Sequence, residues 1–251
     1  MNIAMIYFSG TGNSKYIVDY LGNKLKENNH NVKIYNIEQN PIIPIDTDLL
    51  VIGGPIYAGN VPEKLIRWVL RNVPESSANS IVYSTSAGLI NANGVDSLAK
   101  KLSKKGYNIL AKETYLMPRN FYFGKYPKNT KDEVDKMLED VNKQLDELVD
   151  KICLDTLNSK EFENKGVLGK DLLAETFSVM SRFMGKSFSV DDNCIKCGIC
   201  VKNCPENNID FGKDKNIRFS NKCMLCCRCI HNCPKNAINY KGKKYEQYSL
   251  L

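Results

Sequence analysis

Residues 2–14 read Asn2-Ile-Ala-Met-Ile-Tyr-Phe8-Ser9-Gly10-Thr11-Gly12-Asn13-Ser14, an almost continuous apolar run that passes directly into a loop of glycines and small polar residues. An apolar run without alternation is typical of a parallel strand that is buried on both faces. The residues that follow, 13–28, carry apolar side chains at helical spacing. The opening of the sequence therefore predicts a strand, a tight loop and a helix.

The same alternation continues to residue 152. Further strands are predicted at 32–37, 49–54, 80–86 and 107–117, and further helices at 62–73, 94–105 and 131–152. Five strands that alternate with helices predict an α/β domain with a doubly wound, five-stranded parallel sheet. We place this domain at residues 1–153.

The first loop, Ser9 to Ser14, has the composition of a phosphate site. Small residues leave backbone N–H groups able to point inward, and the N-terminus of the following helix favours negative charge. The loop lacks the third glycine of G-x-G-x-x-G and the lysine of a P-loop, which disfavours a dinucleotide or a nucleoside triphosphate. A monophosphate fits the loop better, and a plain helix cap is the alternative.

With this loop, residues 1–152 resemble the flavodoxin family, whose first loop has the character Ser/Thr-x-Thr-Gly-Asn-Ser/Thr and holds the phosphate of FMN. The resemblance implies a flavodoxin-like fold with FMN as its cofactor. It implies phosphate binding by Ser9, Gly10, Thr11, Gly12, Asn13 and Ser14.

Two further loops follow from the same resemblance. The second, which follows the third predicted strand, would contact the isoalloxazine ring through Pro55, Ile56, Tyr57, Ala58, Gly59 and Asn60. Tyr57 would stack on the ring, with ordinary loop packing as the alternative, and the Gly59–Asn60 peptide would bond near flavin N5. The third loop would flank the other side of the ring with Thr85, Ser86, Ala87 and Gly88. Many flavodoxins have an aromatic residue there, so this chain would leave that ring face open.

Near the C-terminus the spacing C-x-x-C-x-x-C-x-x-x-C-P occurs twice, at residues 194–205 and 223–234. Three cysteines at this spacing can turn their thiolates toward one 4Fe-4S cluster, while the fourth reaches the other cluster. The spacing therefore predicts two crossed ligand sets. One set is Cys194, Cys197, Cys200 and Cys233, and the other is Cys223, Cys226, Cys229 and Cys204.

This C-terminal part resembles the bacterial ferredoxins that carry two 4Fe-4S clusters, and we expect a small α+β domain at residues 189–251. Its two halves repeat at an offset of 29 residues, which indicates a duplicated half-module. Zinc is the competing metal for C-x-x-C pairs, but it does not need the third cysteine of each run. Cys227 stands where the first half has Gly198, and we expect it to be a thiol that packs beside a cluster without binding it.

The bulk composition excludes several classes. Of the ten cysteines, nine lie between Cys194 and Cys233 and no signal-like leader opens the sequence, which argues against a disulfide framework. No apolar run approaches the roughly 18 residues that span a bilayer, so we expect a cytoplasmic protein without stable membrane insertion. The formal charge of +7 falls to about +1 once two clusters and a flavin phosphate are counted, so we expect no nucleic-acid binding.

Three features remain secondary. Residues 154–188 contain an apolar helical stripe (Leu172, Leu173, Thr176, Phe177, Met180, Phe183, Met184), which we interpret as a connector rather than a membrane-surface helix. The aromatic stretch 117–123 would either line the gap between flavin and clusters or form a hydrophobic seam for the second domain. We expect His30 and His231 at the surface and Cys153 as a buried thiol.

The whole chain is similar to fusions, associated with anaerobes, of a flavodoxin-like domain with a C-terminal two-cluster ferredoxin. Most such proteins are assigned only as electron carriers. The resemblance implies a relay that passes single electrons between the two clusters and the FMN, to or from a redox partner protein such as a ferredoxin or a reductase. The alternative is a flavoenzyme, fed by a ferredoxin, that reduces a small oxidant such as a quinone or a nitro compound. The sequence does not indicate an oligomeric state.

Overall fold

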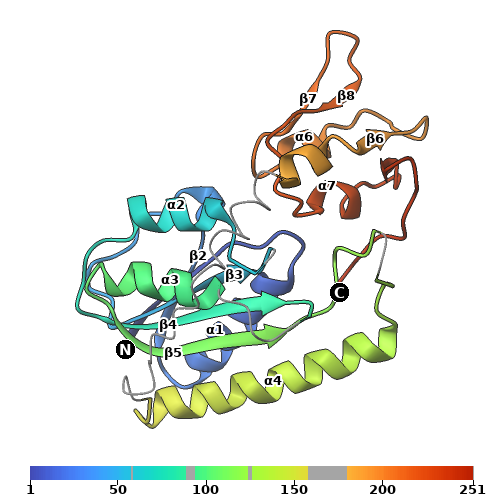
Figure 1. Cartoon of the computed structure of the whole chain (residues 1–251). Helices are drawn as coiled ribbons and strands as arrows, with labels where there is room; N and C mark the ends of the chain where they lie inside the picture. The colour runs from blue at the N-terminus through green and yellow to red at the C-terminus, as the bar shows by residue number, and fades with distance from the viewer. Residues whose placement is uncertain (58, 89–93, 124–125, 158–179, 251) are drawn as a thin grey trace. The chain divides into compact units, whose positions relative to one another are not determined.

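A computed structural model describes the whole chain except residues 58, 89–93, 124–125, 158–179 and 251 (Figure 1). The chain forms two compact units. Unit 1 comprises residues 1–119 and 129–171, and unit 2 comprises residues 120–128 and 172–251. In the described parts of the chain, no helix has both the length and the apolar character that crossing a bilayer requires.

Unit 1 is built on one parallel sheet whose strand order is β2-β1-β3-β4-β5. This order confirms the predicted doubly wound, five-stranded parallel sheet. The strands are β1 (Asn2–Tyr7), β2 (Asn31–Asn36), β3 (Leu49–Pro55), β4 (Asn79–Ser86) and β5 (Asn108–Leu116).

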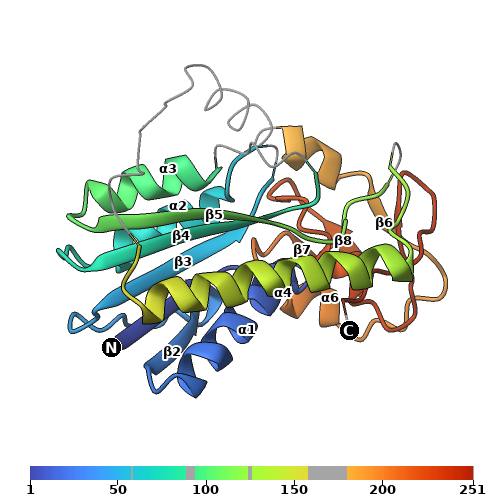
Figure 2. The same cartoon turned by 90° about the horizontal axis from the view of Figure 1, so that it is seen from below.

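Helices cover both faces of this sheet, so its central strands are excluded from water. All seven residues of β3 are buried, as the uninterrupted apolar run predicts. Helices α2 and α3 lie on one face, and α1 and α4 lie side by side on the other (Figures 1 and 2). Their bounds are α1 (Asn13–Glu27), α2 (Glu63–Asn72), α3 (Gly94–Ser103) and α4 (Lys131–Cys153), and a short 3-10 helix, η1, spans Ile37–Gln39.

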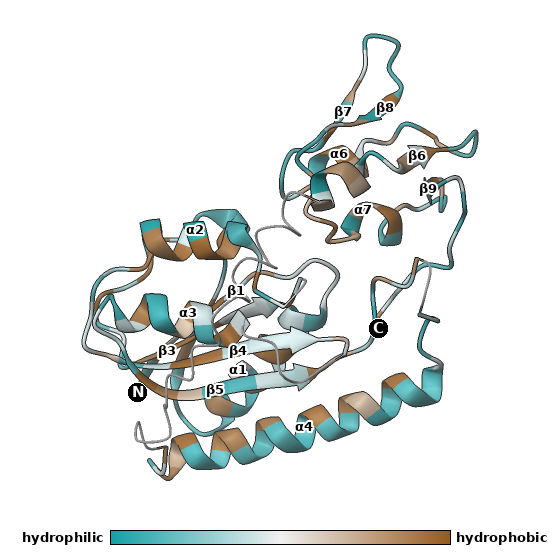
Figure 3. Ribbon diagram, viewed as in Figure 1, coloured by the Kyte–Doolittle hydropathy of each residue, from teal (hydrophilic) through white to brown (hydrophobic). Residues whose placement is uncertain are grey.

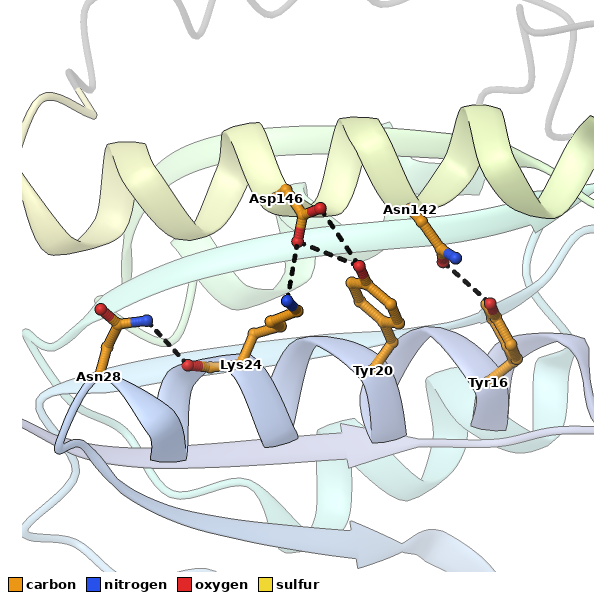
Figure 4. Close-up of polar contacts among 6 residues, drawn as sticks. All are labelled: Tyr16, Tyr20, Lys24, Asn28, Asn142 and Asp146. Atoms are coloured by element: carbon orange, nitrogen blue, oxygen red, sulfur yellow. Dashed lines mark hydrogen bonds and ion pairs between the residues drawn. The ribbon is translucent and has the colours of Figure 1, made fainter.

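Helix α4 combines an apolar stripe with polar contacts to α1. Figure 3 shows hydrophobic and hydrophilic residues alternating along α4, and its buried side chains all lie between Val141 and Ile152. The phenolic oxygen of Tyr16 donates to Asn142 Oδ1 at 2.9 Å, and that of Tyr20 donates to Asp146 Oδ1 at 3.1 Å (Figure 4). These bonds fix the position of α4 along α1.

Unit 2 is a small α+β unit with two antiparallel strand pairs. Strand β6 (Phe188–Val190) pairs with β9 (Ile238–Tyr240), and β7 (Ile209–Phe211) pairs with β8 (Ile217–Phe219). Two one-turn helices, α6 (Ile199–Lys202) and α7 (Arg228–His231), occupy equivalent places in the two cysteine runs. The fold agrees with the predicted small α+β domain.

The duplicated sequence has a duplicated backbone. Positive φ angles occur at three pairs of positions, each separated by 29 residues: 196 and 225, 198 and 227, and 207 and 236. Gly198 adopts φ 74°, and Cys227 adopts φ 60° at the equivalent place. Residues other than glycine rarely adopt a positive φ angle. Cys227 nevertheless adopts one, so both half-modules have the same backbone conformation at this position.

The segment 120–128 leaves unit 1 after β5 and belongs to unit 2. Tyr122 and Phe123 are buried in its aromatic core, where Phe123 contacts Phe188, Tyr240 and Tyr245 with ring centroids 4.7–6.4 Å apart. The stretch 117–123 thus supplies a hydrophobic seam.

The predicted ranges 1–153, 154–188 and 189–251 are consecutive, whereas the compact units are interleaved along the chain.

Most of the predicted connector stripe, including Leu172, Leu173, Thr176 and Phe177, lies outside the described residues. Residues 180–185 are helical and belong to unit 2. Met180 and Phe183 of this helix are exposed, whereas Met184 packs against the aromatic core.

Two predictions about single residues are wrong. His231 is only 7% exposed, because both ring nitrogens have backbone partners and the ring lies among aromatic side chains. Cys153, the last residue of α4, is exposed, and its Sγ lies 3.6 Å from His30 Nε2.

Candidate functional site: a phosphate loop and two cysteine-lined cavities

The first site lies in unit 1, where three loops meet at the carboxyl ends of the strands. The ends of β3, β4 and β5 are in register, with Pro55 beside Thr85 and Thr85 beside Tyr115. In an open parallel sheet, ligands bind at this edge, next to the point where the strand order reverses. Here that point lies between β1 and β3.

The first loop is shaped by Ser9 and Gly12. Ser9 Oγ accepts a hydrogen bond from the Gly12 amide at 3.1 Å, and Gly12 has φ 112°. A Cβ atom at Gly12 would meet nothing within 4 Å, so open space adjoins the loop. Gly10 is buried, whereas Thr11 is partly exposed.

Hydrogen bonds hold this loop to the ends of β4 and β5. Asn13 Nδ2 donates to the carbonyl oxygen of Pro118 at 2.9 Å, and Ser14 Oγ lies 2.8 Å from Thr85 Oγ1. Ser14 and Thr85 are 1% and 3% exposed. These two hydroxyls therefore act in positioning the loop, and the partly exposed members of the loop face outward.

The electrostatics of the loop suit an anion. Among the described residues no side chain caps the N-terminus of α1, and its first turn has no acidic residue. The positive end of the helix dipole therefore has no acidic side chain in the first turn of α1, which favours a bound anion there. The residues present fit a phosphate, and they would hold that of FMN through backbone N–H groups and hydroxyls.

The second and third loops lie beside the first. The Ile56 amide donates to the Thr85 carbonyl at 2.9 Å, and Tyr57 and Asn60 exchange two backbone hydrogen bonds around Gly59, which has φ 90°. Gly59 and Gly88 are exposed, and a Cβ on either would meet nothing within 4 Å. Ser86 and Ala87 are partly exposed, and Ala58 lies outside the described residues. The structure brings the three predicted loops together at one edge of the sheet.

The second site consists of two cavities in unit 2. One is lined by Cys194, Cys197, Cys200 and Cys233. The other is lined by Cys223, Cys226, Cys229 and Cys204, and also by Cys227. Each cavity thus combines three cysteines of one run with the fourth cysteine of the other run, and we call them the first and the second cavity.

The donor set of each cavity fits a cluster better than a single ion. Within the described residues, no three Cys, His, Asp or Glu side chains converge on a point that one metal ion could occupy. Four thiols around a larger space are instead the ligand set of a 4Fe-4S cluster. The residues therefore fit two clusters, each held by four cysteines.

Backbone amides support the cysteine sulfurs at equivalent places. The Asn208 amide donates to Cys204 Sγ at 3.2 Å, and the Ala237 amide donates to Cys233 Sγ at 3.3 Å. Such bonds orient a thiolate ligand and stabilise its negative charge. In the second cavity, the Leu225 amide donates in the same way to Cys223 Sγ at 3.3 Å.

The two cavities differ in solvent exposure. Burial raises the pKa of the Cys226 thiol to about 12, and that of the Cys200 thiol to about 11. Cys197, the counterpart of Cys226, is exposed. Desolvation disfavours the thiolate, so the buried ligands depend more on the positive charge that iron would supply.

Cys227 lines the second cavity but has another partner. Its Sγ donates to the Leu225 carbonyl oxygen at 3.2 Å, and burial raises its pKa well above the ordinary value. The thiol contributes to the aromatic core of unit 2. This arrangement agrees with a thiol that packs beside a cluster.

Sequence reasoning missed the residues that assemble unit 2 around α7. His231 Nε2 lies 2.7 Å from the Asn120 carbonyl oxygen, and Gln247 Nε2 donates to the carbonyl oxygens of Ile230 and Cys233 at 2.8 and 2.7 Å. Burial lowers the pKa of His231 to about 4, which keeps its ring neutral. No local pattern indicates these contacts, because their partners are far apart in the sequence.

Comparison with known proteins agrees with this division. Residues 4–121 match the model of a flavodoxin domain, and residues 187–244 match that of a 4Fe-4S dicluster domain. No curated protein matches the chain.

Solved structures of a flavodoxin and of an FMN-binding stress protein are each similar to part of this chain. Oxidised flavodoxin 1 from Bacillus cereus is 15% identical, with a TM-score of 0.41, over 59% of this chain and 98% of its own. General stress protein 14 from Treponema denticola, in complex with FMN, is 10% identical, with a TM-score of 0.43, over 60% of this chain and 98% of its own. The sheet order, the three loops and the two cavities complete the assignment: this chain joins a flavodoxin domain, residues 4–121, to a C-terminal 4Fe-4S dicluster domain, residues 187–244, a combination that implies electron transfer.

Proposed function

We propose that the protein is an intracellular relay that passes single electrons between two 4Fe-4S clusters and an FMN, to or from a redox partner protein. The observation that carries the proposal is the composition of the two cavities, each of which contains the first three spaced cysteines of one run together with the last cysteine of the other run. FMN exchanges one or two electrons and each cluster exchanges one, so the three groups together can convert between paired and single electrons.

The residues of unit 2 would hold the clusters and adjust their potentials. Cys194, Cys197, Cys200 and Cys233 would bind one cluster, and Cys223, Cys226, Cys229 and Cys204 the other. The amides of Asn208 and Ala237 bond the two exchanged ligands and would favour the more negative, reduced state. Burial of Cys226 would instead disfavour the reduced cluster, because additional negative charge is costly in a desolvated site.

The residues of unit 1 would hold the FMN at the edge of the sheet. The loop from Ser9 to Ser14 would bind its phosphate, and Tyr57 with the Gly59–Asn60 peptide would lie against its ring. The mutual hydrogen bonds of Tyr57 and Asn60 fix the turn that carries this peptide. The fixed turn supports a defined approach of the ring to the backbone.

Cofactor content tests the proposal first. Protein purified without oxygen is expected to contain about eight irons and one flavin per chain. About two irons or fewer, or no flavin, would contradict it.

Rapid mixing tests the relay itself. With a reduced ferredoxin as donor, the absorbance of the clusters is expected to change before that of the flavin. A preparation with flavin but without clusters should accept electrons from the donor much more slowly. Flavin reduction at an unchanged rate in that preparation would refute the relay, and turnover with a quinone or a nitro compound would favour the enzyme alternative.

A further inference from the structure

The two half-modules of unit 2 have the same backbone but different surroundings. In the second half, Leu225, Ile230 and His231 are 5%, 0% and 7% exposed, because Tyr122, Phe123 and Tyr248 pack over them. The positions that correspond to Leu225 and His231 in the first half are Lys196 and Lys202, and both are exposed. The face that is covered in one half-module is therefore open in the other, and it carries lysines there.

This open face lies at the first cavity. Ile195 and Ile199 line the cavity and are 59% and 37% exposed, and Phe211, 41% exposed, has ring carbons within 3.5 Å of where a Cβ on Gly198 would lie. We call these three side chains the apolar patch. Exposed apolar side chains that adjoin one another mark a surface that another molecule covers.

Lysines border the apolar patch. Lys196 and Lys235 line the first cavity, and Lys202 lies one turn after Ile199 on α6. All three are exposed, and we call them the basic rim. Two nearby carboxylates are already paired, Asp191 with Lys244 at 2.9 Å and Asp214 with Arg218 at 3.3 Å. Asp192 and Asp210 remain as exposed acidic residues in this region, so the balance is positive.

We infer that the apolar patch and the basic rim are the docking surface for an acidic one-electron carrier protein. The inference rests on the proposed function and adds the surface and the chemistry of the partner. A positive rim steers an acidic protein toward the surface, and an apolar centre excludes water once it has docked. Docking there would bring the partner's redox group next to Cys197, the exposed cysteine of the first cavity.

The step balances as a single-electron exchange. The reduced carrier loses one electron, and the cluster held by the first cavity gains it. No bond forms or breaks, and no proton moves. The second cavity, whose Cys226 is 8% exposed, is the less accessible of the two.

Charge reversal at the basic rim tests the inference. The variant Lys196→Glu/Lys202→Glu/Lys235→Glu is compared with Lys26→Glu/Lys33→Glu/Lys104→Glu, which changes the net charge equally at exposed positions of unit 1. The holoprotein is mixed without oxygen with a reduced acidic ferredoxin at several salt concentrations. The rim variant is expected to react about 10 to 100 times more slowly at low salt, with a weaker salt dependence, while the control stays within about twofold.

Two further measurements separate the possible failures. Reduced methyl viologen, a small cation, should reduce the clusters of both variants at least as fast as those of the unchanged protein, which shows that the clusters are intact. The variant Ile195→Gln should slow the ferredoxin reaction without changing its salt dependence. Three outcomes would overturn this inference. They are an equal loss of the ferredoxin reaction rate in both triple variants, an unchanged rate in the rim variant, and slowing of only the internal electron transfer to the flavin. Absence of clusters or flavin from the unchanged protein would instead overturn the proposed function.

Discussion

His231 Nε2 lies 2.7 Å from the carbonyl oxygen of Asn120, a residue 111 positions earlier in the chain. On the other side of the ring, Nδ1 accepts a hydrogen bond from the Tyr248 amide at 3.0 Å. Nδ1 is therefore the acceptor, and the proton resides on Nε2, which donates to Asn120. Helix α7 ends at His231, between Cys229 of the second cavity and Cys233 of the first. One imidazole thus joins the segment 120–128 and the C-terminal segment to the helix that serves both cavities.

Replacing His231 by alanine should destabilise unit 2. The Asn120 carbonyl and the Tyr248 amide would both lose their partner in a buried place, which costs about 1–3 kcal/mol for each unsatisfied group. The measurement is thermal loss of the cluster absorbance in the holoprotein, with His30→Ala as the control. Equal midpoints for His231→Ala and the unchanged protein would contradict the role assigned to the ring.

Phe123→Ala should have a larger effect on the same unit. The side chain is 8% exposed and contacts six other rings of unit 2, so its removal is expected to cost about 3–5 kcal/mol. Tyr126→Ala, at an exposed position of the same segment, should be nearly neutral. Denaturant unfolding followed by cluster absorbance compares the two variants, and similar unfolding midpoints would exclude Phe123 from the core.

Cys204→Ser should remove the cluster of the second cavity and leave that of the first. Cys233→Ser should do the reverse, because each cysteine lines the cavity of the other run. About four irons should remain in each variant, with distinct electron paramagnetic resonance spectra after reduction. Loss of the same cluster in both variants would refute crossed ligation.

Cys227→Gly provides the matched control for those two substitutions. Glycine is the residue at the equivalent position 198, and it accepts the positive φ without strain. The variant should keep about eight irons, since the Cys227 thiol bonds the Leu225 carbonyl oxygen. A loss of about four irons would show that Cys227 is a ligand.

Gly12→Ala should weaken FMN binding without a steric clash. Its Cβ would meet nothing within 4 Å, but φ 112° is unfavourable for alanine and is expected to cost about 1–3 kcal/mol. Relaxation of this strain would displace the loop that faces the phosphate. Fluorescence titration of the flavin-free protein with FMN should show an affinity lower by about 5- to 100-fold. The control is Gly242→Ala, which also has a positive φ and open space around its Cβ position but lies in unit 2. An unchanged affinity for FMN would show that Gly12 does not shape the FMN phosphate site.

Gly185→Ala should damage one cluster selectively. A Cβ on Gly185 would lie 2.1 Å from the Cβ of Cys223, so Cys223 would have to move out of the second cavity. The iron content should fall by about four, with the signal of the other cluster retained. Full iron content with unchanged spectra would contradict this packing.

The sequence by itself determined the features that depend on local spacing. The apolar run of β1 and the helical periodicity after it are local patterns, and with the alternation that follows they predicted the doubly wound, five-stranded parallel sheet that the structure has. The repeated cysteine spacing likewise predicted the two sets of four cysteines, and each set lines one cavity, because three residues per step place successive thiols around one space.

Only the tertiary structure decided how unit 2 is completed. The stretch 120–128 is a loop of the flavodoxin part in sequence, yet it supplies Tyr122 and Phe123 to the core of unit 2. A polar residue such as His231 is expected at the surface, and it is buried here because the backbone groups of Asn120 and Tyr248 satisfy its ring. These partners are 111 and 17 positions away, so the contacts depend on packing and leave no periodic trace in the sequence. The same packing buries Leu225 and His231 of one half-module and leaves Lys196 and Lys202, the corresponding residues of the other, exposed.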